Sequence, residues 1–190
     1  AASDVYKRQA PIFSNNKIFV INANDLAIAI NKKGETIWTL QGPTRPTLLS
    51  KGISPALKNN KLLLPFSAGQ LTAVRPNSGA ELWTAAFDQS NKGEAYSIIG
   101  DFGGSPVIKS NKVFLISSSG QLLALKLNSG RKIWSVSVGS NSTPLIVGGS
   151  IFVVSTKGQL VRIGENNGEV IWSRNISVSN TSNEKFFGPT

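Results

Sequence analysis

Four tryptophans recur along the chain, each at the same place in a repeated pattern. They are the only tryptophans of the chain and lie at positions 38, 83, 134 and 172. A glycine stands four residues before each one, at Gly34, Gly79, Gly130 and Gly168. The tryptophans are 45, 51 and 38 residues apart, so only the connectors between copies vary in length. Self-similarity of this kind predicts a repeat architecture in which each copy is one supersecondary unit.

Two further marks extend the pattern upstream. Gly-Gln-Leu begins fourteen residues before three of the tryptophans, at Gly69, Gly120 and Gly158. A proline lies twenty-eight residues before the same three, at Pro55, Pro106 and Pro144. In the first copy Pro11 takes the proline position, and Asn24-Asp25-Leu26 replaces Gly-Gln-Leu. We therefore expect the first copy to be one residue shorter than the others, between Lys17 and Asp25.

The third copy, residues 104–139, shows what each unit should be. Short apolar or alternating segments are separated by Ser110-Asn111, Ser119-Gly120 and Asn128-Ser129-Gly130. Asn, Ser and Gly supply the positive φ angles that tight hairpin turns need, so one copy is a four-stranded antiparallel meander. One meander cannot bury both of its faces, and four-stranded sheets stacked radially form a β-propeller. An ordinary β-sandwich is the alternative, which four matched copies disfavour.

The predicted organisation is all-β, with about four blades of an open, partial propeller. The expected blades are about 10–40, 53–87, 104–139 and 142–177. The expected strands are 11–14, 17–22, 26–31 and 35–40 in the first copy, and 54–58, 61–67, 71–75 and 81–86 in the second. Pro65 falls in one of these strands, and we expect it to face an unpaired side or a bulge, because proline cannot donate to a ladder.

The two ends of the chain depart from the repeat. Residues 1–9 do not match it, and residues 4–9 resemble the translation of a sequencing-library transposon end, so we expect a non-native stretch. A disordered natural terminus is the alternative. Residues 178–190 end in Phe187-Gly188-Pro189-Thr190, which looks like the entry to a further blade. We expect both ends to be cut, and the chain to be a piece of a longer protein.

Composition excludes several kinds of chemistry. The chain has no cysteine and no histidine, which removes disulfides, thiolate zinc sites, cysteine nucleophiles and the commonest general base. The net charge is +10, but the basic residues are spread over turns and strand edges with no run of five, so we expect no nucleic-acid partner. No apolar run reaches the ~20 residues that a membrane-spanning helix needs.

Residues 120–134, GQLLALKLNSGRKIW, resemble the repeat of pyrroloquinoline-quinone-type propellers, whose signature is G-x-L-x-A-L-D-x-x-T-G-K-x-x-W. The resemblance covers about residues 10–177 and implies this propeller fold, in which many members bind no quinone. Two positions of the signature differ here. We align its Asp with Ile30, Arg75, Lys126 and Gly164. We align its Thr with Lys33, Ser78, Ser129 and Asn167. These changes put in question any polar link from the Asp to the turn backbone.

Within that family, three stretches are similar to the periplasmic lipoproteins that serve outer-membrane β-barrel assembly, in their alphaproteobacterial form. The stretches are residues 64–71, 100–107 and 187–189. This resemblance implies eight blades, a lipid anchor outside the present chain and a non-catalytic scaffold on the periplasmic side of the outer membrane. The implied partner is a barrel-assembly subunit. We expect it to contact the long connectors 41–52 and 88–103, although 88–103 could instead plug the groove between neighbouring copies.

We assign no catalytic, cofactor-binding or metal-binding residue, and we expect no cofactor. Two other functions stay open. A quinoprotein dehydrogenase would need a catalytic carboxylate and a calcium site of clustered oxygens, whereas the acids here are scattered and mostly in turns. A sensor or ligand-binding propeller fused to another domain is the second alternative.

Overall fold

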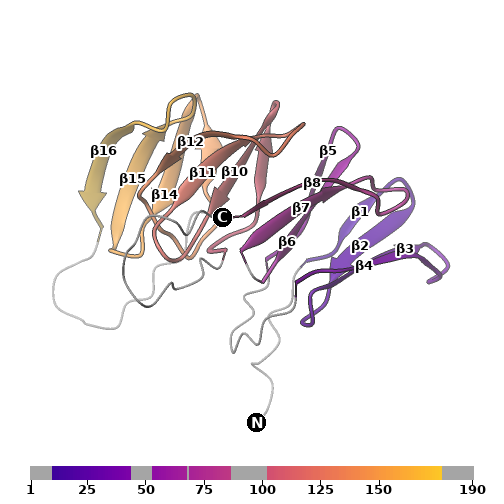
Figure 1. The fold of residues 1–190 in the computed structure, drawn as a ribbon. Coiled ribbons are helices and arrows are strands. Elements are labelled where there is room, and N and C mark those ends of the chain that lie inside the picture. Colours follow the sequence, from indigo (N-terminus) through magenta and orange to yellow (C-terminus); the bar gives the residue numbers. More distant parts are fainter. Residues whose placement is uncertain (1–9, 44–52, 68, 87–101, 177–190) are drawn as a thin grey trace, which may run out of the picture. The chain divides into compact units, whose positions relative to one another are not determined.

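The computed structural model describes residues 10–43, 53–67, 69–86 and 102–176. These residues form sixteen β-strands and no helix, which confirms the predicted all-β class. The chain divides into two compact units, Ala1–Asp88 and Gln89–Thr190, and each unit contains two sheets. Every sheet has four antiparallel strands that follow one another in chain order (Figure 1). We call these sheets blades one to four.

The first unit contains blades one and two. Blade one consists of β1 (Ile12–Ser14), β2 (Lys17–Ile21), β3 (Leu26–Asn31) and β4 (Thr36–Gln41). Blade two consists of β5 (Ala56–Lys58), β6 (Lys61–Phe66), β7 (Gln70–Val74) and β8 (Glu81–Ala86). All eight strands begin and end within two residues of the predicted bounds, because the turn residues between them are unambiguous.

The second unit contains blades three and four. Blade three consists of β9 (Val107–Lys109), β10 (Lys112–Ile116), β11 (Leu122–Lys126) and β12 (Lys132–Val136). Blade four consists of β13 (Leu145–Val147), β14 (Ser150–Val154), β15 (Gln159–Gly164) and β16 (Val170–Asn175). The third copy is thus the predicted meander, with turns at the residues expected.

The turn between the first two strands of a blade uses residues that tolerate positive φ. Asn15 and Asn16 have φ of 48° and 62°, and Asn59 and Asn60 have 49° and 56°. Gly148 and Gly149 take this role in blade four, with 54° and 75°. Such two-residue loops match the twist of the flanking strands, which sets the register of each hairpin.

Each unit has its hydrophobic core between its two blades. In the first unit, one face of blade one meets one face of blade two, and the buried residues are Phe19, Ile21, Ala27, Ala29, Trp38, Leu62, Leu64, Phe66 and Val74. In the second unit the matching core consists of Phe114, Ile116, Leu122, Ala124, Trp134, Ile151, Val153, Val161 and Ile163. We call the boundary between blades one and two the first seam, and that between blades three and four the second seam.

A β-bulge interrupts the pairing of the last two strands in all four blades. It falls directly after the position that pairs with the tryptophan, between Ala29 and Ile30 in blade one and between Ala124 and Leu125 in blade three. Blades two and four shift at the matching places. The residue before the tryptophan is therefore left out of the ladder, and Ile37, Ile133 and Ile171 are among the exposed large apolar residues.

Pro65 lies in β6, where it is buried and has Leu71 of β7 as its register partner. The pairing of β5 with β6 ends at Ala56 and Leu63, two positions before the proline. Pro65 therefore lies beyond the reach of the β5 ladder. This agrees with the expectation that it faces an unpaired side.

The first copy is one residue shorter than the others, but the predicted position of the missing residue, between Lys17 and Asp25, was wrong. Asp25 has φ of 57° and occupies the position of Gly69, Gly120 and Gly158, so Asp25-Leu26-Ala27 corresponds to Gly-Gln-Leu. The missing residue is in the turn between β3 and β4. There Gly34 donates its N–H to Asn31, three residues back, whereas Gly79 reaches Arg75, four residues back. A short turn fits here because Asn31 supplies extra bonds to the backbone.

The same shift corrects the alignment of the signature Asp. In blade one its position is taken by Asn31 rather than Ile30, and the Asn31 side-chain oxygen accepts from the N–H groups of Lys33 and Glu35, both at 2.9 Å. In blade four Asn167, at the signature Thr position, accepts from the N–H of Glu169 at 3.2 Å. A polar link to the turn backbone is thus kept in these two blades by different residues.

Candidate functional site

The tryptophan of one blade is seated on a turn of the next blade. In the first seam, Nε1 of Trp38 donates to the carbonyl oxygen of Pro76 at 2.9 Å. In the second seam, Nε1 of Trp134 donates to the carbonyl oxygen of Glu165 at 3.2 Å. Both rings are buried and pack on a phenylalanine of their own blade, Phe19 and Phe114 respectively. In both seams the indole therefore packs within its own blade and bonds to the adjacent repeat.

The recurring glycine of the last turn also has a steric role across each seam. A Cβ on Gly79 would lie 2.8 Å from Cδ2 of Trp38, and one on Gly168 would lie 2.6 Å from Cε3 of Trp134. Both glycines also have positive φ, of 68° and 73°. Glycine at this position therefore meets two demands, its own left-handed backbone and close contact with the indole of the preceding blade.

Two further links repeat in both seams. The amine of Lys17 donates to Oδ1 of Asn77 at 2.9 Å, and Lys112 donates to Oδ1 of Asn166 at 2.7 Å. The residue before the proline also bonds across each seam. In the first seam the N–H of Ala10 donates to the hydroxyl of Ser54 at 3.0 Å. In the second seam the N–H of Ser105 donates to the hydroxyl of Thr143, also at 3.0 Å. Sequence reasoning missed these links, although a lysine opens the second strand of blades one, two and three.

The second seam holds an ion pair next to its tryptophan. Oε2 of Glu165 lies 2.6 Å from the amine of Lys109, and Oε1 lies 3.9 Å from the amine of Lys112. The carboxylate side chain is only 11% exposed. A largely buried carboxylate needs such partners, because losing water would otherwise cost several kcal/mol. The pair fills the space between the β9–β10 turn and the β15–β16 turn.

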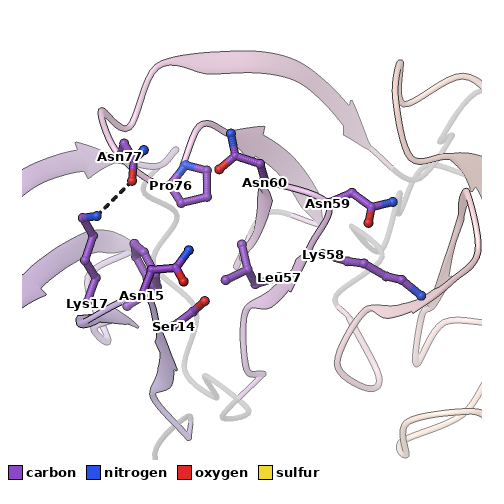
Figure 2. Close-up of a pocket in the computed structure, with 10 residues that line it drawn as sticks. Ser14, Asn15, Lys17, Leu57, Lys58, Asn59, Asn60, Pro76 and Asn77 are labelled. Atoms are coloured by element: carbon purple, nitrogen blue, oxygen red, sulfur yellow. Dashed lines mark hydrogen bonds between the residues drawn. The ribbon is translucent and has the colours of Figure 1, made fainter.

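The corresponding part of the first seam contains a cavity of about 240 Å³. Figure 2 shows its lining, in which the Lys17 amine reaches Asn77 and the side chain of Lys58 extends away from the other residues. Ser14, Asn15, Phe19, Asn59 and Asn60 complete the wall. This cavity is the candidate binding site.

Asp25 makes a separate link across the first seam. Its side chain is buried, Oδ1 accepts from the N–H of Ser67 at 3.0 Å, and Oδ2 accepts from the Ser67 hydroxyl. The acid therefore has a structural role as a bridge between two turns. Together with Glu165, it accounts for the two acids that are buried among the described residues.

The two connectors predicted to contact a partner fall mostly on residues 44–52 and 87–101, which lie outside the described residues. The end of the second connector is packed into blade three. Phe102 is 4% exposed and forms a β-bridge with Ser117, and Gly103 donates its N–H to Ile116 at 2.8 Å. A Cβ on Gly103 would collide with the carbonyl oxygen of Ser140. Residues 102–103 are therefore part of the packing of blade three, and the plug between neighbouring copies stays a prediction.

Within the described ranges, no group of three or more Asp or Glu side chains could hold a metal ion, and no helix is long and apolar enough to span a membrane. Four-stranded blades that are joined through tryptophan within each unit indicate a β-propeller protein of the pyrroloquinoline-quinone-type repeat class. Residues 2–174 match the family described as outer membrane protein assembly factor BamB. The chain belongs to this family.

Individual relatives agree with this family. BamB of Moranella endobia is 26% identical over 131 residues, which is 68% of this chain and 34% of the relative. The crystal structure of BamB from Moraxella catarrhalis matches with a TM-score of 0.77 at 21% identity, over 87% of this chain and 51% of that one. A quinohemoprotein alcohol dehydrogenase from Pseudomonas putida has a TM-score of 0.69 at 12% identity, over 88% and 34%. The chain thus spans about a third of the curated relative, and the likeness to both solved structures shows the fold alone.

Proposed function

We propose that this chain is part of a non-catalytic scaffold, the BamB-type subunit of the machinery that assembles outer-membrane β-barrels. The observation that carries the proposal is the family match over residues 2–174. Its partner is a protein subunit of that machinery, and its place is the periplasmic side of the outer membrane. Blades that are joined by the same hydrogen bonds in each seam provide a rigid frame, and loops on this frame can contact such a partner.

The buried acids support the non-catalytic part of the proposal. Asp25 is held by Ser67 and Glu165 by Lys109, so each carboxylate is used to join two blades. The chain has no histidine or cysteine that could serve as a base or nucleophile beside the abundant hydroxyl groups. The likeness to a quinohemoprotein alcohol dehydrogenase, at 12% identity, is a likeness of fold alone.

The test is recovery of the full-length protein with its partner. An affinity-tagged copy is purified from detergent-solubilised cell envelopes, and bound proteins are identified by mass spectrometry. We expect a subunit of the barrel-assembly machinery to be recovered in a fixed ratio, with a tagged unrelated periplasmic propeller as the control. Recovery of no such subunit, together with quinone-dependent dye reduction by the pure protein, would contradict the proposal and favour a dehydrogenase.

A further inference from the structure

The two seams are built alike, but they differ at one pair of positions. Ser14 ends the first strand of blade one and pairs with Lys17, as Lys109 ends the first strand of blade three and pairs with Lys112. Pro76 and Glu165 each provide the carbonyl oxygen that accepts the indole bond. The first seam thus has Ser14 and Pro76 where the second has the ion pair of Lys109 and Glu165.

This difference explains the cavity of the first seam. The serine is shorter than the lysine, and the proline has no carboxylate, so the space that an ion pair fills in the second seam is open in the first. Lys112 of β10 contacts both Glu165 and Asn166 in the second seam. Its counterpart in the first seam is Lys17, which donates to Asn77. In the described part of the chain, the side chains of Ser14, Asn15 and Asn60 have no hydrogen-bond partner.

We propose that this cavity receives a carboxylate side chain, Glu or Asp, of a partner polypeptide. The incoming carboxylate takes the place that Glu165 holds in the second seam, beside the Lys17 amine and the hydroxyl of Ser14. This inference rests on the proposed scaffold function and deepens it, because it names the side-chain chemistry that the partner presents.

The chemistry of the wall favours an acid of this size. Lys17 retains N–H donors beyond the one used on Asn77, while Leu57, Phe19 and Pro76 offer apolar contact for methylene groups. A volume of about 240 Å³ is below the usual size of a small-molecule pocket, roughly 300–1,000 Å³, but holds one side chain. The chain carries a net charge of +10, which attracts acidic segments before they dock.

The test is a titration of the full chain, labelled with ¹⁵N, with a capped peptide Ac-Gly-Glu-Gly-NH₂ and its glutamine analogue. We expect saturable shifts of the amide signals of residues 14–17 and of Asn77 with the glutamate peptide, and binding roughly tenfold weaker for the glutamine peptide. Lys17→Met should weaken binding of the glutamate peptide by a similar factor. The control is Lys33→Met, which changes an exposed turn lysine of the same blade and should leave the affinity for the glutamate peptide unchanged.

A second variant closes the cavity from within. Ser14→Lys combined with Pro76→Glu rebuilds the ion pair of the second seam, and we expect it to abolish peptide binding while the remaining amide spectrum stays folded. Equal binding of the two peptides, or a glutamate affinity unaffected by Lys17→Met, would overturn the proposal. Because the readout is peptide binding to this chain alone, its failure is distinct from a failure to recover an assembly subunit.

Discussion

The indole nitrogen of Trp38 donates a hydrogen bond at 2.9 Å to the carbonyl oxygen of Pro76, which lies 38 residues later and in the next blade. This bond joins the last strand of one sheet to a turn of another. The same arrangement recurs between Trp134 and Glu165. The two seams are therefore specific polar connections within an apolar core.

Trp38→Phe should destabilise the first seam. The substitution keeps an aromatic ring over Phe19 but leaves the Pro76 carbonyl without its donor, at a cost of about 1–2 kcal/mol in the free energy of unfolding. Trp172→Phe is the control, because Trp172 is only half-buried and should change less. Urea denaturation followed by circular dichroism measures both, and equal losses would contradict the role of the bond.

Gly79→Ala should cost more than Gly34→Ala, although both glycines precede a tryptophan by four residues. Both have positive φ, so each substitution pays about 1–2 kcal/mol for a left-handed backbone. At Gly79 the new methyl group also meets the Trp38 ring, whereas at Gly34 it meets nothing within 4 Å. We expect a difference of about 1–3 kcal/mol in the free energy of unfolding from the added overlap. Identical losses in parallel denaturation curves would argue against the steric role of Gly79.

Asp25 and Ser67 should be energetically coupled. Asp25→Asn keeps a residue that tolerates the left-handed region but removes the charge that both Ser67 donors share. A double-mutant cycle with Ser67→Ala should give a coupling of about 0.5–3 kcal/mol. The matched control is a cycle of Asp25→Asn with Ser78→Ala, a serine in another turn of blade two, where we expect additivity. A coupling of zero for Asp25 and Ser67 would show that the bridge does not stabilise the seam.

Glu165→Gln should lower the stability of the second unit and reduce its dependence on salt. The substitution removes the charge that offsets Lys109 and Lys112, and we expect a loss of about 1 kcal/mol, because Lys109 is partly exposed and its pair is screened by water. Glu169→Gln, in the same turn, serves as the control. Denaturation midpoints measured from low to high sodium chloride test the prediction, which fails if the two variants respond alike.

The fold could be predicted from the sequence because its strongest signals are local. Trp38, its preceding Gly34 and the turn asparagines fix strand bounds without knowledge of tertiary contacts. The register of the first copy could not be predicted in the same way. Asp25 takes the left-handed conformation usually reserved for glycine, and its side chain accepts a hydrogen bond from Ser67, 42 residues later, which the local sequence does not reveal.

The candidate site was harder to predict, because it is defined by a difference between two seams. Ser14 and Pro76 look ordinary in the sequence, and only the register that aligns them with Lys109 and Glu165 makes the cavity understandable. The lysines at the start of the second strands were visible as a recurring mark, but scattered basic residues are normally solvated surface charge. The blade total, the lipid anchor, the alphaproteobacterial likeness and the contact loops stay predictions.

Hydrogen exchange of the four indole N–H groups, followed by NMR of the full chain, tests most directly whether the tryptophans join successive blades. We predict that the indole protons of Trp38 and Trp134 exchange slowly, on the timescale of unfolding of their own seam, while that of the half-buried Trp172 exchanges much faster. Uniformly fast exchange at Trp38 and Trp134 would contradict the account, because it would mean that neither ring is seated on the turn of its neighbouring blade.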